Sequence, residues 1–230
     1  MFNILSLTED FITLWEKNEF IIGVIETLYL TIISTFFAYL IGIPIGVLLN
    51  VTSKNGIRPN KWINVPLGII VNIFRSVPFI ILLVALFPMA KLIVGKTFGS
   101  EVMIMALIIA AIPYVARVVE SSLNEVDKGV VEAASSMGAN TWQIITKVLL
   151  PEAKPSLING GIIATVTILG YSAMADMVSG GGLGQIAISN GFDQGNDDIV
   201  WFCVFLTIII VQVIQELGLF IVRKVDKRNK

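Results

Sequence analysis

Side chains that could do chemistry are scarce in this chain of 230 residues. It has no histidine, which removes the commonest general base, and a single cysteine, Cys203, within an apolar run. One cysteine allows neither an internal disulfide nor a thiolate metal cluster. An intramembrane enzyme would need a nucleophile, metal ligands or an acid–base set, and none is visible. We therefore expect no catalytic residue, no metal and no cofactor in this chain.

One short stretch resembles a nucleotide site. Gly95-Lys96-Thr97 looks like the end of a phosphate-binding loop, but that motif requires a glycine where this chain has Ala90. The intervening residues are apolar and no soluble strand precedes them. We expect that ATP does not bind here.

A few charges lie within apolar segments. For Arg75, a charge at the centre of a lone helix would cost ~2.5–3.5 kcal/mol. Arg75 is either an anchor that snorkels to the inner headgroups or a residue of an inter-helix contact or transport path. Glu216, beside Gln212 and Gln215, is a possible partner, and Glu26 is expected at an interface.

The elements that carry these residues are strongly apolar. Hydrophobic residues make up 55% of the chain and charged residues only 14%, where soluble domains average about 25%. A membrane span needs ~20 mostly apolar residues. Such runs occur at residues 20–49, 65–93, 102–119, 156–178 and 199–222. The sequence therefore predicts an all-α integral membrane protein with about five transmembrane helices, the first two long enough to tilt or extend past the membrane.

Basic residues set the expected orientation. They gather in the loop after the first run, in the loop between the third and fourth runs, and in the tail: Lys54, Arg58, Lys61, Arg117, Lys128, Lys147, Lys154, Arg223, Lys224, Lys227, Arg228 and Lys230. The other side has Lys17, Lys91 and Lys96 and many acids. This bias places the N-terminus outside and the C-terminus in the cytosol. A net charge of −1 indicates no nucleic-acid partner.

The same pattern divides the chain into three regions. Residues 1–19 form an external segment, residues 20–222 the transmembrane domain, and residues 223–230 a basic cytosolic tail. In the first, Ser6 and Glu9 have capping-box spacing, and one stripe holds Leu7, Phe11, Leu14 and Trp15. We interpret it as an interfacial helix without a specific role.

Small residues recur along two of the spans. Such residues let helix backbones approach closely in lipid. They are Thr27, Thr31, Thr35, Ala38, Gly42 and Gly46 in the first span, and Ser156, Gly160, Ala164 and Thr167 in the fourth. Because five spans do not readily enclose a pore alone, we expect a homo- or heterodimer.

The cytosolic loop 125–155 has the most specific pattern. Asp127 can cap a helix with Val131, Ala134 and Ser135 on one face, and Gly138 can supply a turn with a positive backbone angle. Small residues at 133–136 would let a partner approach closely.

A second short helix follows in this loop. Asn140 or Thr141 can cap it, its predicted apolar face holds Trp142, Ile145 and Val148, and Pro151 and Pro155 end it and start the fourth span.

These residues carry a family resemblance. Glu132-Ala133-Ala134, Gly138 and Val148-Leu149-Leu150-Pro151, in this spacing, resemble the EAA loop of ABC importer permeases, which prefer isoleucine at the position of Val148. The resemblance implies the type I importer permease fold, with this loop as the coupling helix that docks on a separate ATPase. It assigns the coupling role to Glu132, Ala133, Ala134, Gly138, Leu150 and Pro151.

Further stretches resemble the methionine-type branch of that family, namely residues 72–83, 170–174 and 180–185. Asp176 departs from the small residue usual there. The resemblance implies a bacterial-type cell membrane and these partners: a second permease copy, two ATPase subunits holding ATP and magnesium, an external binding protein, and methionine.

The transport path is expected in the fourth span. Thr165, Thr167, Tyr171 and Ser172 offer polar contacts, and Met174 is flexible and apolar enough for a dry constriction. Tyr171 and Met174 could instead only fill the core. A permease for another small solute, an ion channel and a proton-coupled carrier remain the alternatives.

Overall fold

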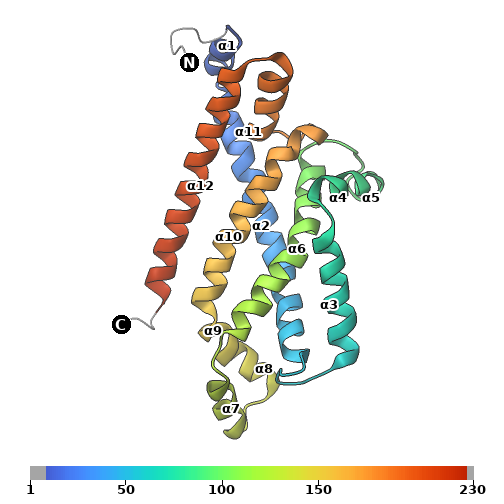
Figure 1. Ribbon diagram of the computed structural model, residues 1–230, viewed down its shortest axis with the longest axis vertical. Coiled ribbons are helices and arrows are strands. Elements are labelled where there is room, and N and C mark those ends of the chain that lie inside the picture. The colour runs from blue at the N-terminus through green and yellow to red at the C-terminus, as the bar shows by residue number, and fades with distance from the viewer. Residues whose placement is uncertain (1–8, 227–230) are drawn as a thin grey trace. The chain divides into compact units, whose positions relative to one another are not determined.

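The computed structural model describes residues 9–226, apart from the side chains of residues 175–177, and contains only helices and turns over that range. Two compact units share the chain. The first comprises residues up to 35, 79–108 and 165–214, and the second comprises residues 36–78, 109–164 and those from 215 onward. The long helices contribute residues to both units (Figure 1).

Five long helical segments correspond to the five predicted spans. Within the described residues, three helices are long and apolar enough to cross a membrane: α2 (Glu19–Thr52), α6 (Ser100–Asn124) and α12 (Asp197–Val225). A fourth candidate is the pair α3 (Lys61–Ser76) and α4 (Phe79–Ala85), when this pair counts as one span. The remaining segment is α10 (Lys154–Ser172). The prediction of an all-α membrane protein is confirmed.

The second predicted span is not one continuous helix, so that part of the prediction was wrong. α3 ends at Ser76, Val77 is extended with φ −85° and ψ 123°, and α4 begins at Phe79. Pro78 explains the break, because proline disfavours helical geometry in the residue before it and cannot donate a backbone hydrogen bond. A further short helix, α5 (Phe87–Ile93), follows α4.

The fourth predicted span also ends earlier than expected as an α-helix. After Ser172 the backbone tightens into the 3₁₀ helix η2 (Ala173–Val178), a common way for an α-helix to end. α11 (Gly182–Gln185), the π-helical turn η3 (Ile186–Gly191) and the 3₁₀ turn η4 (Phe192–Gln194) then lead to α12.

The predicted N-terminal helix is present as α1 (Glu9–Glu16), although Ser6 and Leu7 lie outside the described residues. Phe11 is buried in the first unit, its ring centroid 5.3 Å from those of Phe20 and of Phe202. The side chain of Asn196 donates a hydrogen bond of 2.9 Å to Asp10. α1 is therefore docked on the starts of α2 and α12.

A glycine turn joins η2 to α11 in the first unit. Gly181 and Gly182 have φ of +83° and +87°, and a Cβ on either residue would meet the side chain of Glu26 or Thr27. The backbone N–H of Gly182 donates to Glu26 at 2.7 Å, and that of Leu183 donates to Thr27 at 2.9 Å. Glu26 thus holds this turn against α2.

Small residues bring helices together in the second unit, as the sequence predicts. A Cβ added to Gly46 on α2 would lie 2.5 Å from the carbonyl oxygen of Ala116 on α6, and one added to Gly160 on α10 would overlap Val118. These glycines set the close approach of α2 and α10 to α6.

Candidate functional site: an exposed helix pair and its cleft

Two short helices project beyond the end of α6 (Figure 1). The first is α7 (Lys128–Ser136), whose N-cap Asp127 accepts a hydrogen bond of 2.6 Å from the backbone N–H of Gly129. Capping by aspartate satisfies a donor at the helix start that has no partner within the helix. The predicted cap is confirmed.

Gly138 ends α7 with a left-handed turn. Its φ is +83°, and the backbone N–H of Ala139 donates to the carbonyl oxygen of Ala134 at 3.1 Å. No atom lies within 4 Å of a Cβ built on Gly138. Glycine is therefore required by backbone geometry rather than by space, which confirms the predicted turn.

The second helix, α8 (Thr141–Ile144), starts with a complete capping box. Asn140 and Gln143 exchange side-chain-to-backbone hydrogen bonds of 2.9 Å in both directions. Of the two predicted caps, Asn140 is the one used.

The apolar face predicted for this second helix was wrong. Ile144 and Leu149 are buried, whereas Trp142 is 71% exposed. The reason is that α8 runs into the π-helical turn η1 (Ile145–Leu149), in which residues five apart share a face. α9 (Leu150–Glu152), with Pro151 in its first turn, then leads to α10.

The helix pair presents most of its predicted coupling residues to solvent. Glu132, Ala133 and Gly138 are exposed, Ala134 is buried against the pair, and Met137 is 82% exposed. Leu150 is half-buried and Pro151 is exposed at the joint with α10. We name the solvent-facing set the coupling surface, comprising Glu132, Ala133, Ser136, Met137, Gly138 and Trp142. An exposed apolar methionine and tryptophan beside small residues are typical of a binding surface.

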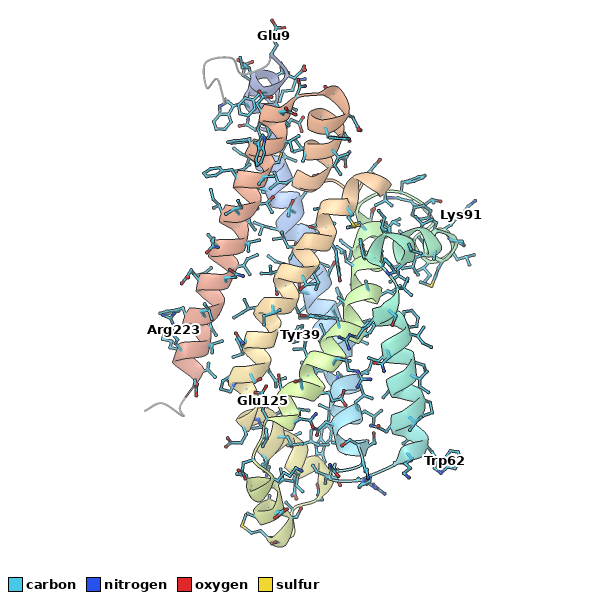
Figure 2. The ribbon with its side chains drawn as sticks, viewed as in Figure 1. Glu9, Tyr39, Trp62, Lys91, Glu125 and Arg223 are labelled. Carbon is cyan, nitrogen blue, oxygen red and sulfur yellow. The ribbon has the colours of Figure 1, made fainter. Side chains whose placement is uncertain are left out.

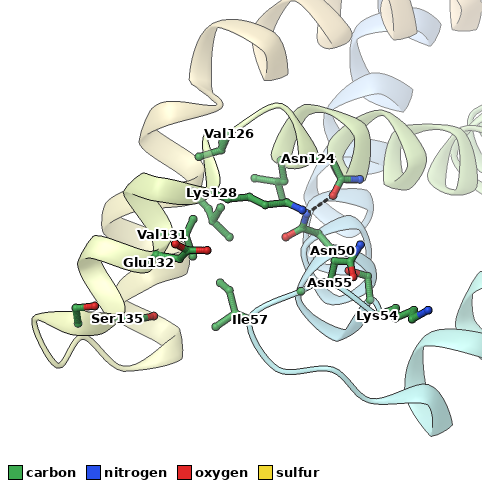
Figure 3. Close-up of a pocket in the computed structure, with 15 residues that line it drawn as sticks. Asn50, Lys54, Asn55, Ile57, Asn124, Val126, Lys128, Val131, Glu132 and Ser135 are labelled. Carbon is green, nitrogen blue, oxygen red and sulfur yellow. Dashed lines mark hydrogen bonds between the residues drawn. The ribbon is translucent and has the colours of Figure 1, made fainter.

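A cleft of about 930 Å³ lies beside the coupling surface, between α7 and the loop after α2 (Figure 3). Lys128, Val131, Glu132 and Ser135 line it from α7, and Asn55 and Ile57 line it from the loop.

Hydrogen bonds to the last turn of α2 hold this loop. The backbone N–H groups of Arg58 and Asn60 donate to the carbonyl oxygens of Val51 and Thr52, each at 3.0 Å. The cleft wall is therefore a fixed element.

The cleft offers charged and hydrogen-bonding groups to a binding partner. The cleft holds two lysines, one carboxylate and several amide and hydroxyl groups. Within the described residues, no group of three or more histidine, cysteine, aspartate or glutamate side chains could hold a metal ion. The arrangement can bind a protein segment through charge and hydrogen bonds.

The predicted path residues lie around the end of α10 in the first unit. Tyr171 stacks on Phe79, and the buried hydroxyl of Ser172 donates to the carbonyl oxygen of Leu169 at 2.7 Å. Thr165, Thr167 and Met174 are half-buried. Phe79 was missed by sequence reasoning, although its position directly after Pro78 marks it as the first residue of a new helix.

The structure does not bring Arg75 together with its proposed partner. Within the described residues, no ion pair joins Arg75 to Glu216, and both side chains are exposed. The side chain of Asp176 lies outside those described. Ion pairs among the described residues include Arg117 with Glu120 on α6 and Lys96 with Glu101. Sequence reasoning assigned Arg117 to a cytosolic loop, although its spacing of three residues from Glu120 suits a helical ion pair.

Long apolar helices and an exposed helix pair define a helical membrane protein. A family model described as "Binding-protein-dependent transport system inner membrane component" matches residues 42–230, and the chain belongs to this family. It has the type I ABC importer permease fold, which confirms the resemblance stated above.

Individual relatives agree with this assignment. The chain is 50% identical over 203 residues to the probable D-methionine transport system permease protein MetI of Vibrio cholerae, covering 88% of this chain and 90% of that one. It is 43% identical over 181 residues to the methionine import system permease protein MetP of Bacillus subtilis, covering 79% and 82%. A solved structure of the inward-facing MetNI methionine ABC transporter superposes with a TM-score of 0.90 at 43% identity, covering 96% of this chain and all of that one.

Proposed function

We propose that this chain is the permease subunit of an ATP-driven importer of methionine. Two copies form the translocation path, two ATPase subunits bind on the cytosolic side, and an external binding protein delivers the solute. Relatives named for methionine import, at 43–50% identity over most of the chain, support the substrate.

One observation carries the mechanism: the coupling surface is exposed to solvent in the part of the chain that the structure describes, residues 9–226. Glu132 and Ala133 are exposed on α7, and Gly138 turns the chain sharply before α8. Docking of this pair in a groove of the ATPase would couple ATP hydrolysis to the permease. ATP and magnesium bind to that subunit, and this chain contributes Glu132, Ala133, Ala134 and Gly138 to the contact.

Leu150 and Pro151 are proposed to transmit the movement of the helix pair to α10. They form α9, which leads through Ala153 directly to α10. Movement of the helix pair therefore reaches α10 through this joint, and with it the residues proposed for the path.

The path is lined by Thr165, Thr167, Tyr171 and Ser172, and Met174 from the two copies closes a dry gate. Arg75, whose side chain is exposed in one copy, is proposed to face this path rather than lipid, because an unpaired charge is costly in lipid. Discrimination by one methylene is worth only ~1–3 kcal/mol, so selectivity lies mainly in the binding protein.

The orientation is proposed as N-terminus outside and C-terminus in the cytosol, with residues 1–19 external, 20–222 forming the permease domain and 223–230 the basic tail. Trp62, 91% exposed at the start of α3 next to Lys61, points away from its helix as an interfacial aromatic residue does (Figure 2). Arg223 and Lys224 end α12 on the same proposed side.

Reconstitution tests the proposal. The chain is incorporated in proteoliposomes together with its ATPase and its binding protein, and uptake of labelled methionine is measured. Uptake is expected only with ATP and the binding protein. Uptake of a different amino acid or a peptide, but not of methionine, would reject the substrate and leave the permease role intact. Methionine flux that ignores ATP would reject the importer in favour of a channel or carrier.

A further inference from the structure

Polar contacts between helices gather at one end of α6 in the second unit. Asn124 accepts a hydrogen bond of 2.8 Å from Asn50 on α2, and Ser122 accepts one of 3.0 Å from Ser156 on α10. Arg117 reaches a third helix, α3, with bonds of 3.1 Å to the carbonyl oxygen of Gly68 and 2.8 Å to the side-chain oxygen of Asn72. Residues 117–124 therefore join α6 to three neighbours.

Arg117 makes the strongest of these contacts. One end of its guanidinium group lies 2.6 Å from the carboxylate of Glu120, and the other end makes both bonds to α3. Its side chain is 25% exposed and that of Glu120 is 17% exposed. Because Arg117 and Glu120 are mostly removed from water, the bond between them is weakened little by solvent, whereas the bond from Arg117 to the exposed side chain of Asn72 is open to solvent. Arg117 therefore holds α3 and α6 at a fixed spacing.

The location of this contact matters, because α6 leads straight into the coupling helix. Only residues 125–127 separate the end of α6 at Asn124 from the start of α7 at Lys128. Within that link Val126 is buried and Asp127 caps α7. A link this short and this well packed gives α7 little freedom to move without α6.

We infer that Arg117 is a positioning residue that transmits motion of the coupling helix from α6 to α3. This inference rests on the proposed function, because it requires an ATPase that moves α7. α2 and α10 are joined to α6 by neutral side chains, whereas α3 is joined to α6 by a charged group, one nitrogen of which binds two oxygens one helical turn apart, on Gly68 and Asn72. The start of α3 is also tied to α2, because the side chain of Asn64 donates to the carbonyl oxygen of Leu49 at 2.8 Å and to the hydroxyl of Thr52 at 3.1 Å. Without Arg117 the start of α3 stays tied to α2, but the part of α3 around Gly68 and Asn72 no longer follows α6.

A purely structural role for Arg117 predicts something different. In that case substitution of Arg117 lowers the amount and the thermal stability of the folded protein. The molecules that remain folded then take up as much methionine per ATP hydrolysed as the wild type does. The two roles therefore separate in the ratio of methionine taken up to ATP hydrolysed, and in the ATP-dependent movement of α3.

The variants are chosen to keep the protein folded. Asn72→Ala removes the bond to the Asn72 side chain and leaves both the bond to the Gly68 carbonyl oxygen and the ion pair with Glu120 in place. Arg117→Lys keeps the charge but not the guanidinium group, and Arg117→Ala removes both. The matched control is Lys96→Ala, which breaks the ion pair of Lys96 with Glu101, whose side chains are 59% and 55% exposed. An exposed pair contributes little, so this control should behave as the wild type.

Transport coupling is measured in the reconstituted complex. We expect Arg117→Ala to lower methionine uptake per ATP by at least about five-fold, the lower end of typical coupling between two sites. Asn72→Ala should lower it less, because the bond to the Gly68 carbonyl oxygen remains. Arg117→Lys should lie between Arg117→Ala and the wild type, because one ammonium group cannot replace the guanidinium group. An unchanged ratio in Arg117→Ala would overturn the inference.

Distances between spin labels report the motion itself. In a Cys203→Ser background, a single cysteine replaces either Ile70 on α3 or Lys147 on η1, both of which are exposed. For each position, the distance between the two equivalent labels of the permease dimer is measured. Trapping with ATP and vanadate should change both distances in the wild type, and only the Lys147 distance in Arg117→Ala, which removes both bonds to α3. An equal change of the Ile70 distance in that variant would overturn the inference. If neither distance changes in the wild type, the proposed coupling to an ATPase fails instead.

Discussion

The ring of Tyr171, near the end of α10, stacks on the ring of Phe79, the first residue of α4, with centroids 4.9 Å apart and planes 5° apart. Phe79 follows the proline that interrupts the second predicted span, and Tyr171 lies just before α10 tightens into η2. The stack therefore joins two places at which a regular helix ends. Backbone N–H and C=O groups at helix ends lack hydrogen-bond partners within the helix, so side-chain contacts are needed to fix the position of these ends.

Removal of this stack should loosen the proposed gate. Stacked aromatic pairs contribute about 0.5–1.5 kcal/mol beyond the burial of their surface. Phe79→Ala is expected to raise methionine leak from loaded proteoliposomes in the absence of ATP, and Met174→Ala is expected to do the same. Phe36→Ala is the matched control, because Phe36 is 60% exposed and contacts only its neighbour Phe37 among aromatic rings of the described residues. Equal leak from all three variants would contradict the assignment of the gate.

Gly138 offers a direct test of coupling. Valine at φ +83° costs about 1–3 kcal/mol of backbone strain, although no atom blocks its Cβ. Gly138→Val should insert normally but lose ATP hydrolysis stimulated by the binding protein and substrate. Gly138→Asn should retain most of it, because asparagine tolerates left-handed geometry.

Gly195→Val is the control for strain alone. Gly195 has φ +74° and equally open surroundings, and it lies outside the helix pair. Stimulated hydrolysis should therefore survive this change. The coupling role of the turn would be rejected if both valine variants behaved alike.

Local rules explain which features of the coupling region were predictable. Asp127, Gly138 and Asn140 each act through hydrogen bonds or backbone angles within four residues, and all three occupy the predicted roles. The break after Ser76 is equally local, since Pro78 is visible in the sequence. It was not predicted because residues 65–93 form one long apolar run, which was interpreted as a single span. Hydropathy reports the solvent that a segment faces and not whether its backbone is continuous.

Contacts between distant residues could not be predicted in the same way. The stack of Phe79 on Tyr171 and the bonds from Arg117 to α3 join residues far apart in the sequence. The π-helical turn after Ile144 changed which residues are buried, because one inserted residue rotates everything after it. Charge counting placed Arg117 in a loop, since a count along the chain does not show where a helix ends.

The orientation of the chain can be measured with two cysteines. In a Cys203→Ser background, Asn55→Cys reports the loop after α2 and Asp193→Cys reports the turn before α12, both at exposed positions. The basic residues around Asn55 predict a cytosolic position for it. A membrane-impermeant maleimide added to whole cells should label only the cysteine at 193, and cell lysis should make the other accessible. Labelling of both positions in intact cells would exclude the proposed orientation.

Close packing of α2 on α6 should make Gly46 sensitive to the smallest substitution. A Cβ at this position would lie 2.5 Å from the carbonyl oxygen of Ala116 and 2.6 Å from the Cβ of Val119, so both helices must shift. Overpacking of this kind typically costs about 1–3 kcal/mol. Gly46→Ala should therefore lower the unfolding temperature of the detergent-solubilised protein.

The control for this substitution is Gly170→Ala on α10. No atom lies within 4 Å of a Cβ built there, so alanine is accommodated and removes the helix penalty of glycine, about 1 kcal/mol. Its unfolding temperature should equal or exceed that of the wild type. A fall of the same size in both variants would show that glycine is needed for helix flexibility, and not for the contact between α2 and α6.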